Sequence, residues 1–247
     1  MTSDLINKKK IQYRFQRFEF KYYLSRRNID AMYNILLNNH MVPDPFLSEK
    51  DYYMVSSLYF DSPTLKCYNE KISGIKHRAK LRLRTYDENF DYYENVFLEI
   101  KRKADAVIIK DRAKIDAGLY YKSLNGAFQE EDLGNKTIEE FFMRQRAYSM
   151  VPLVLVKYKR KPLVSKFDDN LRITFDYDLE AGQADSFSSH QTINPIFPAE
   201  SVMEVKYNNS LPSWIHRIIQ KYELSRQAVS KYCYGIDTIK QHHQLKF

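Results

Sequence analysis

Polar and apolar residues alternate along much of this chain. The clearest case is residues 78–84, where Arg78, Lys80, Arg82 and Arg84 are separated by small or apolar residues. Because successive side chains of a strand point to opposite faces, this segment predicts a strand with four cations in a row on one face. Like charges this close repel one another, so the row requires either open water or a polyanion beside it.

The same alternation recurs elsewhere and predicts a strand-rich protein. A period of two with one apolar face is typical of half-buried antiparallel strands. The predicted strands cover residues 13–23, 51–60, 78–86, 94–103, 106–116, 151–161, 170–179 and 200–208.

Helices are predicted between and after these strands. Thr137 and Glu140 have the spacing of a capping box, Gly74 is a plausible helix end, and residues 181–199 are the most loop-like segment. The predicted helix starts are Ser25, Ser62 with Pro63, Thr137, Ser213 and Ser225.

An eight-stranded antiparallel sheet with one charged face can close so that this face lines the inside. Its apolar face then points outwards, where helices cover it. The sequence therefore predicts an α+β fold, an eight-stranded antiparallel tunnel barrel with a charged interior flanked by helices. One domain is expected over residues 1–247, with a short basic extension at 1–12 and a polar tail at 240–247.

Composition indicates an ordered protein with an anionic partner. The 247 residues are 44% hydrophobic and 15% aromatic, and the formal net charge is +8. Such a charge favours nucleic acid, nucleotide, polyphosphate or an acidic membrane as partner. The longest apolar run, Val151 to Val156, is too short to cross a bilayer, and no secretory signal is apparent, so a cytoplasmic protein is predicted. Two cysteines make neither a disulfide framework nor a zinc motif.

The charged faces have two interpretations. The polar face of a single antiparallel strand is commonly just solvated. Several segments rich in Lys and Arg favour instead a shared concave cationic site, because sheet surfaces usually carry Thr, Ser and mixed charges. Glu19, Glu99 and Glu204 fit this second interpretation, since they would repel a phosphate directly but would hold a divalent metal that bridges to it.

Seven short motifs, taken in order, resemble a known family. They are Glu19-Phe-Lys21, Lys80-Leu-Arg82-Leu-Arg84, Leu98-Glu-Ile-Lys-Arg-Lys103, Lys110-Asp-Arg112, Arg172-Ile-Thr-Phe-Asp176, Met203-Glu-Val-Lys206 and Ser230-Lys231-Tyr232. This order resembles the VTC domain, the polyphosphate polymerase branch of the triphosphate tunnel metalloenzymes. The resemblance extends from about residue 14 to residue 236.

The resemblance implies a tunnel that takes ATP with Mn or Mg and extends a phosphate chain from the γ-phosphate. The matching positions are Lys21, Arg82, Arg84 and Arg172 for phosphate, Lys71 and Lys231 for two further cations, Glu204 for the metal, and Arg160 and Ser230 as looser matches. The wider superfamily opens with Glu-x-Glu-x-Lys, and here Arg17 takes the first Glu position. This departure favours the polymerase branch over a two-metal hydrolase. Membrane coupling would require a partner protein.

The candidate site residues follow from these motifs and from the alternating faces. Phosphoryl transfer needs positioning and charge neutralisation, for which Arg gives bidentate contacts and Lys a mobile charge. The predicted catalytic residues are Lys21, Arg82, Arg84, Arg172 and Lys231, with Lys71, Lys80, Lys101, Lys110, Arg112, Arg160, Lys206 and Ser230 as further phosphate contacts and Glu19, Glu99 and Glu204 as metal ligands.

Three functions stay open, with polyphosphate synthesis from ATP preferred. A hydrolase would use water as nucleophile, but no convincing general base is present beyond the glutamates. The third is a non-catalytic binder of polyphosphate or nucleic acid. Nucleic acid is disfavoured because Phe18, Phe20 and Phe175 are predicted to lie opposite the cations, whereas a nucleic-acid surface interleaves the two. The expected partners are therefore ATP or another triphosphate and inorganic polyphosphate.

Overall fold

The computed structural model describes residues 17–47, 50–87, 95–105, 107–129, 134–188, 193–196, 201–242 and 245. The strands are β1 (Arg17–Tyr23), β2 (Met41–Pro43), β3 (Tyr53–Asp61), β4 (Arg78–Thr85), β5 (Val96–Ala104), β6 (Val107–Ile115), β7 (Val151–Ser165), β8 (Arg172–Gln183), β9 (Asn194–Pro195) and β10 (Ser201–Asn208). The helices are the 3-10 turn η1 (Arg26–Asn28), α1 (Ile29–Leu37), α2 (Lys66–Ile72), α3 (Ala117–Asn125), α4 (Lys136–Ala147), α5 (Ser213–Lys221) and α6 (Lys231–Gln241).

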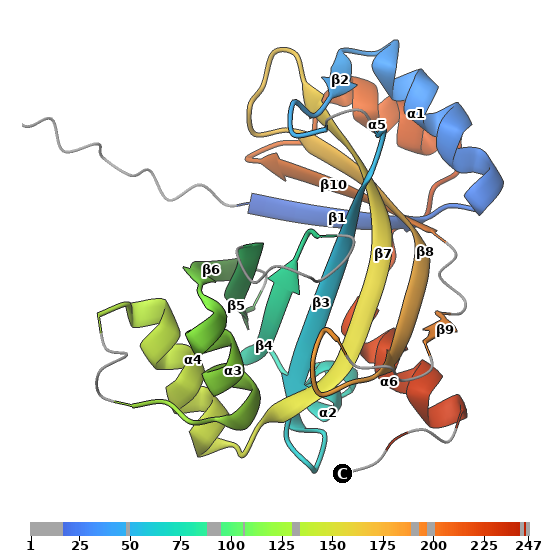
Figure 1. Ribbon diagram of the computed structural model, residues 1–247. Coiled ribbons are helices and arrows are strands. Elements are labelled where there is room, and N and C mark those ends of the chain that lie inside the picture. The colour runs from blue at the N-terminus through green and yellow to red at the C-terminus, as the bar shows by residue number, and fades with distance from the viewer. Residues whose placement is uncertain are drawn as a thin grey trace, which may run out of the picture.

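One antiparallel sheet forms the body of the protein. Eight strands follow one another in the order β1-β10-β8-β7-β3-β4-β5-β6, while β2 pairs with β7 and β9 pairs with β8. The sheet curls into a half-barrel (Figure 1), which confirms the predicted eight-stranded α+β fold.

The two edge strands of the half-barrel, β1 and β6, lie close together. Within the described residues no backbone pairing joins them, so we call this junction the seam. An ion pair spans it, with Lys101 Nζ of β5 lying 3.6 Å from a carboxylate oxygen of Glu19 of β1. Side chains rather than backbone hydrogen bonds therefore connect the two edges.

Helices cover the outer face of the sheet, as the alternation predicts. On β4 and β5, Leu83 and Leu98 point outwards and are fully buried in one cluster with Phe141 of α4. On the other half of the sheet, Phe175 and Val205 are buried in a second cluster with residues of α1 and α5. The apolar faces thus supply the core, which leaves the charged faces on the concave side.

Helix α6 is the exception, because it packs on the concave side. Gly235 lies against Val154 and Val156 of β7, and these alternate on the same face as Tyr158 and Arg160. The approach is so close that a Cβ on Gly235 would lie 2.9 Å from Val154 Cγ1. The start of α6 is thereby held inside the half-barrel.

Several predicted helix starts are wrong, and local hydrogen bonds explain why. Helix α2 begins at Lys66 rather than at Ser62 and Pro63, because the Asp61 carboxylate accepts backbone N–H groups of both Ser62 and Cys67, at 2.8 Å each, and so holds a turn there. Gly74 does follow the end of this helix, with a φ of 72°.

Asn135, rather than Thr137, caps α4, since its side chain accepts the backbone N–H of Thr137 at 2.9 Å. Helix α6 begins at Lys231 instead of Ser225. The intervening segment runs beside β1, where Gln227 donates its backbone N–H to the Lys21 carbonyl at 2.8 Å.

The remaining helices and strands agree only in part with the sequence predictions. The predicted start of α5 at Ser213 is confirmed, and Ser25 precedes η1. Helix α3 and the short strands β2 and β9 were not predicted, and β8 extends into the segment predicted as a loop. The basic extension 1–12 lies outside the described residues, and α6 includes the first two residues of the predicted tail. In the described part of the chain, no helix is both long and apolar enough to span a bilayer.

The close packing of α6 predicts the effect of adding one methyl group. Gly235→Ala places that group against two β-branched strand residues, which costs roughly 1–3 kcal/mol, whereas alanine returns about 1 kcal/mol through helix propensity. We therefore expect a net loss of unfolding free energy, measured by urea denaturation.

Gly118→Ala in α3 is the matched control, since the nearest atom to its added Cβ lies at 3.4 Å. It should be neutral or slightly stabilising. An equal gain from both substitutions would contradict the close contact at Gly235.

Candidate functional site

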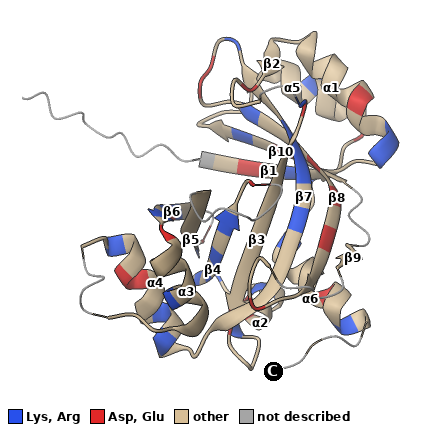
Figure 2. Cartoon of the chain, viewed as in Figure 1, with Lys and Arg blue, Asp and Glu red and all other residues tan. Residues whose placement is uncertain are grey.

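The concave face of the sheet encloses a cavity of about 1930 Å³. Its lining contains fifteen Lys and Arg side chains but four Asp and Glu side chains. Basic positions recur on β4, β7 and β10 (Figure 2), and residues of each of these strands line the cavity. The charged faces of strands distant in sequence therefore converge on one cationic site.

The structure brings together nearly all of the predicted site residues. Glu99 is the exception, since its carboxylate is buried and does not line the cavity. The predicted residues that line it are Glu19, Lys21, Lys71, Lys80, Arg82, Arg84, Lys101, Lys110, Arg112, Arg160, Arg172, Glu204, Lys206, Ser230 and Lys231.

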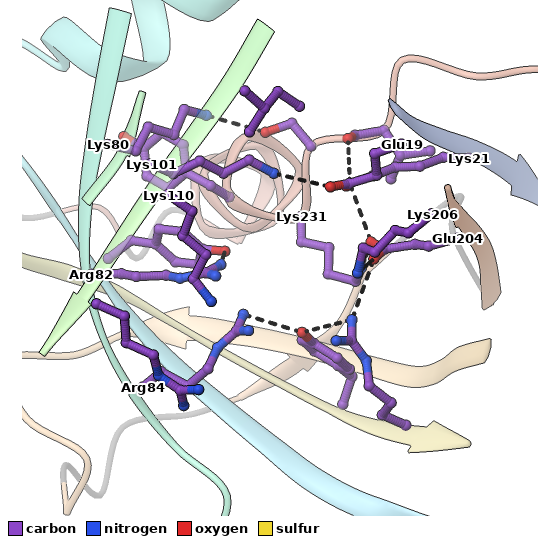
Figure 3. Close-up of a pocket in the computed structure, with 18 of the residues that line it drawn as sticks. Glu19, Lys21, Lys80, Arg82, Arg84, Lys101, Lys110, Glu204, Lys206 and Lys231 are labelled. Atoms are coloured by element: carbon purple, nitrogen blue, oxygen red, sulfur yellow. Dashed lines mark hydrogen bonds and ion pairs between the residues drawn. The ribbon is translucent and has the colours of Figure 1, made fainter. Parts of the chain in front are cut away.

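Glu204 of β10 is the central counter-ion of this site (Figure 3). One of its oxygens lies 3.2 Å from Lys21 and 2.8 Å from Lys231, and the other lies 2.9 Å from Lys206 and 3.4 Å from Arg160. Burial alone would raise the pKa of the Glu204 carboxyl, but these four cations hold that pKa well below its usual range. Glu204 is therefore ionised and shared among four positive charges.

Asp176 of β8 is a second buried counter-ion. It accepts two hydrogen bonds of 2.6 Å from Arg160 and lies 2.5 Å from Lys231. Burial would raise the pKa of its carboxyl, but the charges of Arg160 and Lys231 lower it. The carboxylate thus fixes both cations at the wall of the cavity.

Glu99 acts from behind the cavity wall. Its carboxylate accepts a 2.7 Å hydrogen bond from Arg82 and lies 2.5 Å from Lys110 and 3.3 Å from Arg112. Burial would raise the pKa of the Glu99 carboxyl, but the charges of Arg82, Arg84 and Lys110 lower it. Glu99 therefore orients three predicted phosphate-binding residues.

The three predicted metal ligands do not form one centre. Glu19 and Glu204 lie on either side of Lys21, at 3.0 and 3.2 Å from its Nζ, while Glu99 is in a separate cluster. Within the described residues, no three His, Cys, Asp or Glu side chains are placed to hold a metal ion. Since cations already contact each of the three carboxylates, this arrangement does not fit a metal centre built by the protein alone.

Some cations of the lining have only neutral partners among the described residues. Arg84 donates to Ser57 Oγ at 3.1 Å and to Tyr158 Oη at 3.3 Å, and Lys80 donates to Ser230 Oγ at 3.2 Å. Arg172 binds Asp44 at 2.7 Å, yet its buried Nε has no hydrogen-bond partner there. These groups leave positive charge available for an anionic ligand.

Tyrosines also line the cavity, and the sequence did not predict them. Tyr59 faces Arg82 across the β3–β4 pair, and its hydroxyl accepts a 2.8 Å hydrogen bond from that residue. Burial raises the pKa of Tyr59, but the nearby Arg82 and Arg84 bring it down to about 8. Only the strand register could have revealed this pairing, because β3 is buried on both faces and shows no clean alternation.

The expectation that aromatic residues lie opposite the cations is only partly correct. Phe20 and Phe175 do pack in the outer cluster. Phe18 packs there too, stacked on Tyr207, but it also borders the cavity, as do tyrosines such as Tyr158. Because aromatic side chains lie beside the cations in the cavity, the position of the aromatic residues disfavours nucleic acid less than the alternation suggested.

With this geometry established, comparison with known proteins identifies the family. The sequence model of the VTC domain matches residues 16–240. The chain belongs to the VTC domain family. The order of motifs along the sequence had implied this family, and the match covers nearly the whole described structure.

One protein with a similar sequence is a distant relative of this VTC domain. Subunit 4 of the vacuolar transporter chaperone complex of Trypanosoma brucei brucei is 25% identical over 227 residues. The match covers 76% of this chain but only 28% of that subunit, so this chain corresponds to a minor part of its relative.

One solved structure shows a similar fold, and a second aligns with a TM-score below 0.5. A candidate adenylate cyclase from Bacillus halodurans aligns with a TM-score of 0.51 at 10% identity, over 87% of this chain and 94% of that protein. A Hippeastrum adenylyl cyclase candidate with a dominant triphosphatase activity aligns with a TM-score of 0.48 at 12% identity, over 94% and 97% of the two chains. At 10% identity the likeness to the Bacillus halodurans protein concerns the fold alone.

The buried pair of Asp176 with Arg160 and Lys231 predicts a large stability effect. Asp176→Asn removes the closest carboxylate of two buried cations and leaves Glu204, which two further cations share, as their remaining acidic partner among the described residues, so we expect the free energy of unfolding to fall by roughly 3–5 kcal/mol. Urea denaturation at neutral pH measures this change.

Asp178→Asn provides the control two residues further along β8. Asp178 lies 2.9 Å from Lys159, but its side chain is 40% exposed, so its loss should cost at most about 1 kcal/mol. Equal losses from both substitutions would show that the buried pair contributes no more than the exposed one.

Proposed function

We propose that this VTC domain binds ATP in its cationic cavity and transfers the γ-phosphoryl group to a growing inorganic polyphosphate chain. The observation that carries this proposal is the large excess of Lys and Arg over Asp and Glu around one cavity. A triphosphate or a polyphosphate supplies the negative charge that this lining lacks. Membership of the VTC family supports the same substrate class.

The proposed reaction is an in-line displacement at the γ-phosphorus. The terminal phosphate oxygen of the growing chain forms the new P–O bond, the bond between the γ-phosphorus and the β–γ bridging oxygen breaks, and ADP leaves. Such a transition state gains mainly from positioning and charge neutralisation. Arg82 and Arg84 are held for this by Glu99, Tyr59, Ser57 and Tyr158, so their orientation is set before the ligand binds.

The other cations surround the same space. Lys21 and Lys231 are fixed by Glu204, and the partly exposed Arg172 side chain is held by Asp44. We assign to these three residues the contacts that hold the triphosphate against the arginines. The carboxylates of Glu19 and Glu204 are paired with cations, which disfavours them as general bases for water and favours a phosphate acceptor over hydrolysis.

Two further elements of the proposal come from the family resemblance. A Mn or Mg ion would neutralise phosphate charge when bound, and Glu204 is the carboxylate that would contact it. Because the protein carboxylates do not form a metal centre by themselves, we assign no step to the ion. A membrane-protein partner that receives the product is also proposed, and the trypanosome relative is itself a subunit of a complex.

The products decide between polymerase, hydrolase and binder. Purified protein is incubated with ATP and Mn or Mg, ADP and free phosphate are quantified, and phosphate chains are resolved by electrophoresis. ADP with long anionic chains is the expected result. ADP with an equal amount of free phosphate would indicate a hydrolase, and tight binding without turnover would indicate a polyphosphate-binding tunnel.

Removal of one orienting cation should then reduce turnover. Arg84→Gln removes a buried guanidinium that has no carboxylate partner in the described part of the chain, so we expect kcat to fall by about 100-fold. Lys159→Gln is the matched control, because Lys159 also lies in the sheet but binds Asp178 away from the cavity. Equal rates for both variants would remove Arg84 from the proposed machinery.

The crowded cations also predict proton uptake on binding. Burial and the nearby Arg82 and Arg84 lower the pKa of Lys110 to about 7 despite its contact with Glu99. For Lys101, Glu19 acts to raise the pKa, but burial, Lys21 and Arg82 together lower it to about 8. An anion beside these lysines favours their charged forms, so ATP binding should take up protons.

At higher pH these lysines are neutral and attract ATP less strongly. Affinity for ATP should therefore fall as the pH rises from 7 to 9, and calorimetry at pH 8 in buffers of different ionisation enthalpy should register uptake. Lys110→Gln should reduce the number of protons taken up, while Lys159→Gln should not. Uptake that is unchanged in Lys110→Gln would contradict the role of this lysine.

A further inference from the structure

Four aromatic side chains meet at one end of the cavity. We call this group the aromatic collar; it consists of Phe46, Tyr53, Tyr86 and Phe97, all of which line the cavity. Their rings form a continuous set, with centroid distances of 5.5 Å for Phe46–Tyr53, 5.6 Å for Tyr53–Tyr86, 6.4 Å for Phe46–Tyr86 and 5.9 Å for Tyr86–Phe97.

The antiparallel topology explains why these residues come together. Tyr53 begins β3, Tyr86 follows the end of β4 and Phe97 lies near the start of β5. Because these neighbouring strands are antiparallel, all three residues lie at the same end of the strands (Figure 1). Arg78 and Lys103 line the cavity at the opposite ends of β4 and β5, where they pair with each other. The aromatic collar thus lies at one end of the cavity, away from Arg78 and Lys103 at the other.

The collar is in direct contact with predicted phosphate-binding residues. The Arg112 guanidinium lies 3.5 Å from the centre of the Phe97 ring and donates to the Tyr86 hydroxyl at 3.1 Å. Arg172 donates to the Tyr53 hydroxyl at 3.5 Å. A ligand whose anionic part is held by these arginines therefore brings its adjoining part to the collar.

Phe46 is the solvent-exposed side chain of the aromatic collar. Its side chain is 68% exposed, and the turn that carries it is tied to the site. The Phe46 backbone N–H donates to Asp44 at 2.8 Å, and the same Asp44 carboxylate binds Arg172 at 2.7 Å. The exposed ring is thereby positioned by a residue that also orients a cation of the cavity.

We propose that the aromatic collar is a nucleobase subsite, which stacks the base of a nucleoside triphosphate while its phosphates occupy the cationic cavity. Aromatic rings bind bases through their faces, and an arginine beside them adds a cation–π contribution. The charged cavity alone would hold inorganic tripolyphosphate as well as ATP. The collar supplies the contacts that only the nucleoside can use. This inference rests on the proposed binding of a triphosphate in the cavity.

Comparison of two ligands tests the subsite. Calorimetry measures the affinities of ATP and of inorganic tripolyphosphate for the intact protein, for Phe46→Ala and for Phe167→Ala. Stacking on one ring predicts that Phe46→Ala weakens ATP binding by about 5- to 150-fold and leaves tripolyphosphate within about twofold. Phe167→Ala is the matched control, because Phe167 is 79% exposed and does not line the cavity.

A fluorescent variant tests the contact itself. Trp214 is the single tryptophan of the chain and lies on α5, outside the cavity lining. Phe46→Trp should keep ATP affinity, and its emission should change with ATP but not with tripolyphosphate. The Phe167→Trp control should respond to neither.

The outcomes separate the subsite from the proposed function. Equal losses of both ligands in Phe46→Ala, or no loss of ATP binding together with an unresponsive Phe46→Trp, would overturn the subsite while leaving a triphosphate-binding cavity intact. Binding of neither ligand by the unmodified protein would overturn both the proposed function and the subsite.

Discussion

Repulsion among buried cations is the constraint on which this structure depends. Like charges inside a low-dielectric cavity destabilise the fold unless carboxylates are placed between them. Glu204, Asp176 and Glu99 have this role, and each contacts at least two cations. They neutralise the lining only in part, so the cavity keeps both its shape and a strong attraction for anions.

The apolar outer face of the sheet must be shielded from water. Because the charged face is concave, the outer face must find its own cover, and α1, α4 and α5 provide it in two separate clusters. Helix α6 instead enters the concave side, where Ser230 caps it by accepting the Cys233 N–H. Its first turn then delivers Lys231 to Asp176 and Glu204, so the position of one helix sets a large part of the charge balance.

Strand patterns were the most predictable part of the fold. A row such as Arg78 to Arg84 reveals its two faces directly, and nearly all the cations found in this way do line the cavity. Helix starts were less predictable, because caps such as Asn135 compete with neighbouring Ser and Thr residues. Helix α3 did carry a signal, with Asp116 at its start and Gly126 at its end.

Contacts between distant strands could not be read from the sequence. The register that places Tyr59 opposite Arg82, and the turn that places Phe46 at the mouth of the cavity, depend on how the sheet curls. The burial of Glu99 could not be predicted from the sequence either. Its alternation puts it on the charged face, but the cations above it cover it completely.

The seam between β1 and β6 couples the shape of the protein to what it contains. Lys101 is shared between Glu19 across the seam and the open space of the cavity. An anion that binds Lys101 therefore competes with Glu19 for the same charge, and by linkage the separation of the two edges changes the affinity for that anion. The ion pair that connects the two edges is therefore weakened both by high ionic strength and by any anion that binds Lys101.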